Sequence, residues 1–353
     1  MLKEEMQEIS IAGRKIGPLH PPFVVCELSA NHNGSLDQAI RLIEIAKKIG
    51  ADAVKIQTYT PDTITLDTRK SEFQITEGAW AGKTLYELYE WAHTPWDWHQ
   101  ALFDVARDMD IVIFSSPFDH SAVDFLETLK TPAYKIASFE AVDLPLIHYA
   151  AKTKKPLIIS TGMANKVEIE EAIRSARNGG CNQIGILHCV SGYPASSKDY
   201  NLRTLTDMLS SFEIVAGLSD HTLSHTTAIA AISLGASIIE KHLTLDRTAG
   251  GPDDFFSLEP QEFEELIFEI RTAWEALGTV SYDLSASESS NIKFRRSLYF
   301  VKDLSAGDII SNDAIRSIRP GYGLKPKYRD QVIGKNVKRN IKKNSPVKLT
   351  DLT

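Results

Sequence analysis

Three lysines lie inside short apolar segments, where a charged side chain needs a partner. They are Lys55 in AVKIQTY, Lys135 in AYKIAS and Lys241 in SIIEKHLTL. Lysine is almost never buried unless it is paired. Each lysine alone is equally consistent with a structural ion pair to a glutamate on a neighbouring strand. Because three occur together, beside several serines, we favour a site that binds a phosphate or carboxylate.

Two histidines end apolar segments that follow one another in the chain. His221 follows EIVAGLSD, and His242 lies within SIIEKHLTL. Two imidazoles can bind one divalent cation and leave positions open for substrate and water. This small ligand set suits Mn²⁺ or Mg²⁺ better than a structural zinc. The alternative for each histidine alone is a hydrogen-bonded residue of the core.

The segments that position these residues alternate between apolar runs and helical stretches. Near-continuous apolar runs are typical of parallel strands that are buried on both faces. Helical patterns separate them, as in 35–50, which ends at a glycine. The eight apolar runs are 23–30, 53–59, 111–117, 133–138, 156–162, 184–190, 213–220 and 237–245.

Eight strand–helix units predict an α/β fold, a (β/α)8 TIM barrel over 21–280, with its active site at the carboxyl ends of the strands. A doubly wound open sheet is the alternative. The first strand, however, runs into ELSANHNG, which lacks the glycine-rich phosphate loop of that fold. We predict that 1–20 form a capping hairpin. The insertion at 60–95 is long enough to be functional or to carry its own helix.

The C-terminal part of the chain differs in composition from the rest. Residues 281–292 are polar and serine-rich, which predicts a linker, and 293–353 read as a small β-rich domain. The latter segment holds 15 Lys and Arg against 5 Asp and Glu, whereas the whole chain carries a net charge of −7. We therefore expect a basic surface that docks on an acidic one, within the chain or across a dimer. Nucleic-acid binding is not expected, because no aromatic residues interleave the basic ones.

The cysteine count and the hydropathy of the chain indicate where the protein works. Its three cysteines, an odd number in apolar surroundings, argue against a disulfide framework and for a reducing compartment. The N-terminal residues lack an apolar stretch of signal-peptide length. No run of about 18 apolar residues occurs, so we expect a cytoplasmic protein that does not cross a membrane.

Taken together, the strand ends resemble the sialic acid synthase family. The matching motifs, one for each strand, are ELSANHNG (27–34), GADAVKIQTY (50–59), FSSPFD (114–119), YKIASFE (134–140), STGM (160–163), LHCVSGYP (187–194), GLSDHT (217–222) and EKHLTLDR (240–247). GPD (251–253) follows the last of them, and RPGYG (319–323) resembles the SAF, or antifreeze-like, domain of the same family. The resemblance covers the chain from about residue 8.

This resemblance implies an enzyme that condenses phosphoenolpyruvate with an amino-sugar aldehyde, assisted by Mn²⁺ or Mg²⁺. It also implies a homodimer in which the small domain of one chain covers the barrel mouth of the other. The implied catalytic residues are Glu27, Lys55, Lys135 and Glu140. Those implied for substrate binding are Gln57, Ser116, Ser138, Ser160, Ser191, Tyr193, Asp253 and Arg319, the last acting on the partner's sugar site. His221 and His242 are the implied metal ligands.

The first motif departs from the pattern of most of the family. Sialic and legionaminic acid synthases typically read EIGxNHxG there, whereas this chain reads ELSANHNG. Together with YTPDT (59–63) and SSPFD (115–119), this motif resembles the pseudaminic acid branch. The expected sugar is then 2,4-diacetamido-2,4,6-trideoxy-L-altrose, whose C6 is a methyl group.

Other functions remain open on the sequence. Within the family, the product can instead be N-acetylneuraminic or legionaminic acid. A more distant alternative is a deoxy-heptulosonate or deoxy-octulosonate phosphate synthase. Those enzymes use phosphorylated sugars and usually lack the small domain. A non-catalytic sugar-binding protein on an inactive barrel is the alternative from another class, and the complete set of charged residues argues against it.

Overall fold

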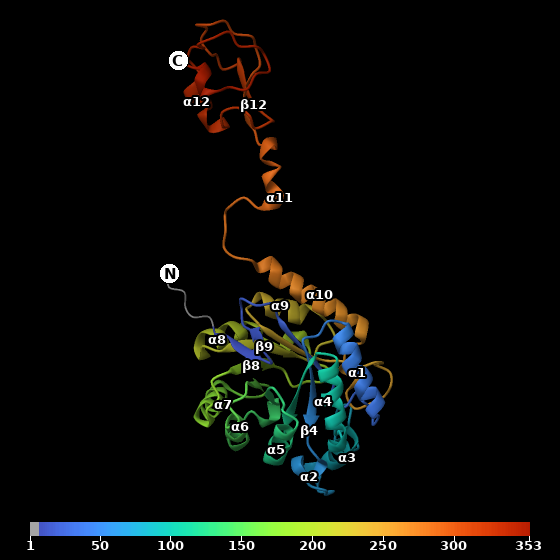
Figure 1. Cartoon of the computed structure of the whole chain (residues 1–353). Coiled ribbons are helices and arrows are strands. Elements are labelled where there is room, and N and C mark those ends of the chain that lie inside the picture. The colour runs from blue at the N-terminus through green and yellow to red at the C-terminus, as the bar shows by residue number, and fades with distance from the viewer. Residues whose placement is uncertain (1–6) are drawn as a thin grey trace. The chain divides into compact units, whose positions relative to one another are not determined.

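The computed structural model describes residues 7–353, which divide into two compact units after Gly278 (Figure 1). The first six residues of the predicted N-terminal hairpin, 1–6, lie outside the described part. Over the residues described, no helix combines the length and apolar character that crossing a membrane requires.

The first unit is a closed barrel of eight parallel strands, which confirms the predicted fold class (Figure 1). Around the barrel the strands follow in the order β10-β3-β4-β5-β6-β7-β8-β9. Their bounds are β3 Phe23–Glu27, β4 Ala53–Thr58, β5 Val112–Pro117, β6 Tyr134–Ile136, β7 Leu157–Ser160, β8 Ile184–Cys189, β9 Val215–Asp220 and β10 Ile238–His242.

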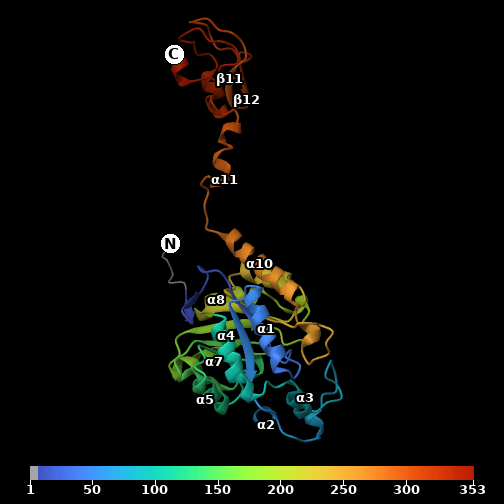
Figure 2. The same cartoon turned by 45° about the vertical axis from the view of Figure 1, so that its right-hand side comes forward.

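Helices that follow the strands form the outer layer of the barrel (Figure 2). They are α1 Leu36–Lys48, α4 His99–Asp108, α5 His120–Thr128, α6 Leu144–Ala151, α7 Lys166–Gly179, α8 Arg203–Phe212, α9 Thr226–Ser233 and α10 Pro260–Leu277. Local sequence sets their limits: Ser35 caps α1 by accepting a hydrogen bond from the Gln38 N–H. Gly180 ends α7 at a φ of 98°, a conformation that glycine adopts without strain.

The interior of the barrel changes character along its axis. At its amino end, inward side chains such as Phe23, Val25, Phe114 and Ile238 form an apolar floor. Side chains along a strand alternate between the two faces, so Glu27, two residues after Val25, also faces inward but one level higher. The same spacing takes β10 from Ile238 to Glu240 and then to His242. A polar layer therefore lies above the floor, toward the carboxyl ends of the strands.

A hairpin precedes the first barrel strand. It consists of β1 (Ile9–Ile11) and β2 (Arg14–Ile16), paired antiparallel. Ile9, Ile11 and Ile16 belong to the same buried cluster as the apolar floor. The hairpin therefore packs against the amino end of the barrel, opposite the polar layer.

The insertion after β4 carries helices of its own. They are α2 Pro61–Ile64, η1 Ser71–Phe73 and α3 Leu85–Ala92, and η2 Trp96–Trp98 then leads into α4. Thr84 caps α3 in a capping box with Glu87, which fixes where this helix begins. Further short helices, η3 Ser138–Glu140, η4 Ser197–Asp199 and η5 Asp254–Phe256, follow β6, β8 and β10.

The second unit has its own core and few regular strands. Strands β11 (Ser297–Phe300) and β12 (Ile315–Ile318) pair antiparallel, and isolated bridges such as Leu304–Ile341 extend the β structure. Buried Leu298, Phe300 and other apolar residues form its core. Its short helices are α11 Ala286–Ser289, η6 Ile292–Phe294, η7 Pro326–Tyr328, α12 Arg329–Val332 and η8 Leu349–Asp351.

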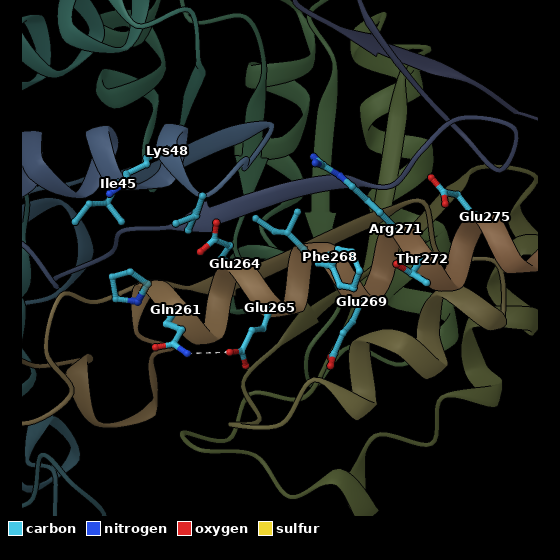
Figure 3. Close-up of a pocket in the computed structure, with 13 residues that line it drawn as sticks. Ile45, Lys48, Gln261, Glu264, Glu265, Phe268, Glu269, Arg271, Thr272 and Glu275 are labelled. Atoms are coloured by element: carbon cyan, nitrogen blue, oxygen red, sulfur yellow. Dashed lines mark hydrogen bonds between the residues drawn. The ribbon is translucent and has the colours of Figure 1, made fainter.

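A surface groove of about 1080 Å³ runs between α1 and α10 on the outer wall of the barrel (Figure 3). The side of α10 that borders it is acidic, and the exposed Phe268 lies among the glutamates. None of the candidate site residues lines this groove. The candidate residues of this unit lie instead on or just after the strands of the barrel.

Candidate active site

Two lysines and two glutamates form a buried network in the polar layer. Lys55 Nζ forms an ion pair with Glu27 and lies 3.6 Å from Glu240 Oε1. Lys135 Nζ donates to the same Glu240 oxygen at 2.9 Å. All four side chains are almost completely buried. Glu240 therefore links the lysines of β4 and β6 across the barrel.

The charges of this network shift one another's proton affinity. Burial raises the pKa of Glu27 and lowers that of Lys135, because each charged form loses water. Burial acts downward on Lys55 as well, but the carboxylates of Glu240 and Glu27 outweigh it and raise the pKa of Lys55. The second oxygen of Glu240 accepts no hydrogen bond from the described residues. The network therefore has capacity for a further hydrogen-bonding group.

Lys241 does not join the network. Its Nζ donates to Asp220 Oδ2 at 2.7 Å and to the carbonyl of Thr222. Because Glu240 and His242 face the interior, Lys241 between them faces the helices. The prediction that all three lysines mark an anion site is therefore wrong for Lys241, where the structural ion pair applies instead.

Four predicted serines lie at or just after the carboxyl ends of β5 to β8. Ser116 Oγ accepts from Lys55 Nζ at 3.3 Å, and Ser138 Oγ accepts from the Gly162 N–H at 3.2 Å. The buried hydroxyls of Ser160 and Ser191 have no partner among the described residues. Unpaired buried hydroxyls are costly unless a ligand satisfies them. This arrangement fits a phosphate or carboxylate.

Gly162 lies beside two of these serines and has no side chain, which leaves room for their hydroxyls. A Cβ built on Gly162 would lie 2.2 Å from Ser191 Oγ and 2.8 Å from Ser138 Oγ. No side chain fits at that distance, so only glycine permits both hydroxyls to approach this turn. The motif STGM thus has a physical reason for its glycine.

A second polar group surrounds Glu27 at the end of β3. Gln57 Nε2 donates to Glu27 Oε1 at 3.1 Å and lies 3.1 Å from Ser29 Oγ. Ser29 Oγ donates to Asp253, and burial raises the pKa of the Asp253 carboxyl. These contacts bring Asp253, from the loop after β10, to the first motif.

Glu140 stands at the end of η3, after β6. Burial raises the pKa of its carboxyl to about 7, and its Oε2 atom has no hydrogen-bond partner in the part of the chain that the structure describes. A carboxyl with a pKa near neutrality can act as an acid or a base at physiological pH.

The two predicted metal ligands lie beside each other. The ring centroids of His221 and His242 are 5.4 Å apart. His221 Nδ1 lies 2.9 Å from the carbonyl of Val190, which makes Nδ1 the protonated nitrogen and leaves Nε2 as an electron-pair donor. His242 Nδ1 is buried without a partner in the described chain. These nitrogens fit a divalent cation, although no cluster of three His, Cys, Asp or Glu occurs among residues 7–353.

Aromatic rings border the histidine pair. Tyr193, after β8, lies 4.6 Å from the His221 ring and 5.0 Å from Phe256, measured between centroids. Phe256, from η5, lies 4.8 Å from the His242 ring. The site thus combines an anion-binding interior with an aromatic edge at the histidines.

Two family models together match most of the chain. The NeuB family model matches residues 42–282, and the SAF domain model matches residues 295–353. The chain belongs to the NeuB family.

Individual relatives cover nearly the whole NeuB chain. It is 41% identical over 329 residues to pseudaminic acid synthase of Campylobacter jejuni, which covers 93% of this chain and 96% of that protein. It is 35% identical to N,N'-diacetyllegionaminic acid synthase of Legionella pneumophila, with 94% and 96% covered. Among solved structures, the sialic acid synthetase of Leptospira borgpetersenii shows a TM-score of 0.72 and 31% identity, with 81% of this chain and 95% of that chain covered.

The NeuB barrel brings most of the predicted residues to the carboxyl ends of its strands and to the loops that follow them. Arg319 belongs to the second unit, just after β12, so it is not among the site residues that the barrel holds. Glu240 and Ser29 were not assigned a role from the sequence, yet they connect the other site residues. The period of two along β10 contained the signal for Glu240, because it lies two residues before His242.

Proposed function

We propose that this NeuB-family enzyme is a pseudaminic acid synthase. It condenses phosphoenolpyruvate with 2,4-diacetamido-2,4,6-trideoxy-L-altrose to give pseudaminic acid and phosphate. The observation that carries the proposal is the polar layer, in which two buried lysines and unpaired serine hydroxyls lie near the His221–His242 pair. The higher identity to a pseudaminic than to a legionaminic acid synthase supports the choice of sugar.

Phosphoenolpyruvate occupies the interior of the barrel in this proposal. Lys55 and Lys135 balance its anionic groups, and the serines and Gln57 donate hydrogen bonds to them. The unpaired hydroxyls of Ser160 and Ser191 support this placement. Holding both anionic ends fixes the position of C3, the carbon that must form the new bond.

The sugar lies above phosphoenolpyruvate, at the barrel mouth. Glu140, Tyr193 and Asp253 contact it from the barrel, and Arg319 of the partner subunit contacts it from the small domain. The raised pKa of Glu140 supports a role in proton exchange with a sugar hydroxyl or the aldehyde.

His221 and His242 would hold Mn²⁺ or Mg²⁺ at the aldehyde end of the sugar. The bound cation supplies Lewis acidity, which polarises the aldehyde oxygen. The hydrogen bond from His221 to the Val190 carbonyl fixes the tautomer that such a ligand requires.

The proposed reaction uses each of these groups. C3 of phosphoenolpyruvate attacks the aldehyde carbon, and positive charge develops at C2. Glu27 stabilises this charge and orients the water that adds to C2. Phosphate leaves with the bridging oxygen by C–O cleavage, and the product closes to a ring. No covalent intermediate with the protein forms.

Product analysis tests the proposal directly. Purified protein, phosphoenolpyruvate and Mn²⁺ are mixed in parallel with the altrose-type sugar, its diacetamido counterpart of the legionaminic route, and N-acetylmannosamine. Phosphate release and product mass are measured. We expect turnover of the altrose-type sugar. Turnover of only one of the other two would assign the chain to a sister activity, N-acetylneuraminic or legionaminic acid synthesis.

Two further outcomes bear on the more distant alternatives. Turnover of arabinose 5-phosphate or erythrose 4-phosphate alone would assign a deoxy-sugar-phosphate synthase, and no phosphate release with any sugar would favour a non-catalytic sugar-binding protein. Label in the bridging oxygen of phosphoenolpyruvate should appear in phosphate. Its retention in the sugar would exclude C–O cleavage.

We also propose a cytoplasmic, domain-swapped homodimer. Exposed apolar side chains after the barrel strands, among them Phe139, Met163 and Leu223, support a covering partner. The basic C-terminal segment supports a small domain that meets an acidic barrel. The cysteines, all unpaired thiols, support a reducing compartment.

A further inference from the structure

The insertion after β4 contains a small loop with a tryptophan at its tip. Gln74 and Thr84 form a β-bridge, and the Ile75 N–H donates to the Lys83 carbonyl at 2.9 Å. Between these ends, Trp80 is half-buried although the residues on either side of it are exposed. A loop of this kind holds one large side chain against another part of the molecule.

Trp80 is held by the loops after two other strands. Its Nε1–H donates to the Pro252 carbonyl at 2.9 Å. Its ring centroid lies 5.8 Å from that of Tyr193 and 6.3 Å from that of Phe255. The indole is thus fixed by a hydrogen bond at one edge and by aromatic packing on its surface.

The order of strands shows where this contact lies. In the closed barrel, β4 and β8 are separated by three strands in either direction. Trp80 belongs to the segment after β4, whereas Tyr193 follows β8. The Gln74–Thr84 loop therefore brings Trp80, from the β4 side of the barrel, into contact with residues that follow β8 and β10.

The rings continue from this loop to the metal ligands. Tyr193 contacts Trp80 on one side and lies 4.6 Å from the His221 ring on the other. Trp80 is therefore one ring further from the histidine pair than Tyr193. In the proposed function the aldehyde lies at the histidines, so a sugar extended along this aromatic row would place its last carbon nearest to Trp80.

We propose that Trp80, with Tyr193 and Phe255, forms an apolar wall that packs on the C6 methyl group of the sugar and selects 6-deoxy substrates. This inference rests on the proposed function, and it names the residue that selects the sugar within that site. A C6 hydroxyl against this wall would lose water without gaining a partner. An apolar pocket of this kind rejects an added hydroxyl by up to about 100-fold.

The test compares two sugars that differ only at C6. Wild-type protein and Trp80→Ala are assayed with 2,4-diacetamido-2,4,6-trideoxy-L-altrose and with its 6-hydroxy counterpart, and kcat and KM are measured for each. In Trp80→Ala, kcat/KM for the 6-deoxy sugar should fall about 10-fold or more, mainly through KM. The value of kcat/KM for the 6-hydroxy sugar should change much less. The ratio of kcat/KM between the two sugars should therefore decrease. KM for phosphoenolpyruvate, bound deeper in the barrel, should not change.

Two further variants separate the wall from the stability of the loop. Trp80→Phe keeps an apolar ring but loses the hydrogen bond to Pro252, and it should retain most of the preference. Trp91→Ala removes another tryptophan of the same insertion, one that is 41% exposed and lies beneath Lys83 Nζ at 4.9 Å. This control should behave as wild type with both sugars.

Each outcome decides one of the two proposals. If the wild type does not use the 6-deoxy sugar, the proposed function is wrong and the inference fails with it. If the wild type uses that sugar and Trp80→Ala keeps the same preference, only the inference is wrong. An equal loss for both sugars in Trp80→Ala would also contradict selection at C6, because it would show a general effect on the mouth.

Discussion

The interior of the barrel tolerates four charged side chains because each has a partner within the network. Glu240 contacts the lysines of two different strands, and Glu27 forms an ion pair with Lys55. Removing one partner from a buried pair costs far more than the pair contributes, because the remaining charge stays buried. The network is therefore sensitive to single changes and more tolerant of paired ones.

The first prediction concerns this network at the level of single residues. Lys135→Met should lower the free energy of unfolding by about 3–5 kcal/mol, because Glu240 loses its nearest cation. The double variant Lys135→Met with Glu240→Gln should recover part of that loss without recovering affinity for phosphoenolpyruvate. Urea unfolding measures the first effect and initial rates the second.

The matched control uses an exposed ion pair. Lys166 lies 3.1 Å from Asp207, with both side chains more than half exposed. Lys166→Met should change the free energy of unfolding by less than about 1 kcal/mol. An equal loss of unfolding free energy in Lys135→Met and Lys166→Met would contradict the role of the buried network.

The second prediction concerns Glu140 and pH. The pKa of its carboxyl rises from 4.5 to about 7 on folding because burial disfavours the charged form. The stability linked to this group is complete below pH 4.5 and is lost as pH rises through 7. Relative to Glu140→Gln, the wild type should lose up to about 3 kcal/mol of unfolding free energy over that range. Parallel stability curves for the two proteins would refute the shift.

For single residues, burial was easier to predict than the side of the strand that a side chain faces. A lysine in an apolar strand signalled burial for all three lysines, but the alternation of β10 turns Lys241 toward the helices and Asp220. The sequence contained that alternation. The partner did not follow from it, because ion pairs form between strands that are distant in the chain.

The strands and helices place the serines through tight turns. Gly162 follows β7, and the hydroxyls of Ser138 and Ser191 occupy the space beside it. Turns at the ends of strands thus decide the geometry of the anion site as much as the strands themselves do.

The third prediction tests this turn. Gly162→Ala places a methyl group where the serine hydroxyls lie, so KM for phosphoenolpyruvate should rise about 10-fold or more, as expected when positioned polar groups move. Gly192→Ala is the control, because a Cβ there meets its neighbours at ordinary distances of 3.5 Å or more. Steady-state kinetics with phosphate detection compares the two. Equal KM values would show that the turn does not shape the anion site.

Elements with strong periodicity were predictable, and irregular ones were not. The apolar runs predicted all eight barrel strands because buried parallel strands leave a local signal. The path of the 74–84 loop left none, since Trp80 meets Pro252 across 172 positions of sequence. In the C-terminal unit, short strands were expected, but isolated bridges provide much of the pairing there.

At the scale of the whole molecule, the chain divides where its composition changes. The two units part after Gly278, near the polar segment 281–292. Only the second unit contains Arg319, whereas the lysine network lies in the first. In the proposed dimer, a complete site therefore needs two chains.

The fourth prediction tests that arrangement by complementation. Lys55→Ala and Arg319→Ala should each be inactive as homodimers, because every site lacks one residue. Coexpression of the two variants creates heterodimers in which one site has both residues, so about a quarter of wild-type activity should return. If Arg319 acted within its own chain, the mixture would stay inactive. Sedimentation of the separate variants checks that each still forms a dimer.

The buried cysteines offer a way to measure how often the barrel opens. Cys26, Cys181 and Cys189 are all buried in the first unit, and the sequence of the second unit contains none. Cys26 and Cys181 are fully buried, so a thiol reagent added to the native protein reaches them only when the barrel opens. Their rate of alkylation therefore measures that opening, and the small domain adds no signal because it has no cysteine. Cys189 Sγ lies 3.9 Å from His221 Nδ1. Slower alkylation of Cys189 on adding phosphoenolpyruvate would therefore report occupancy of the site without any turnover.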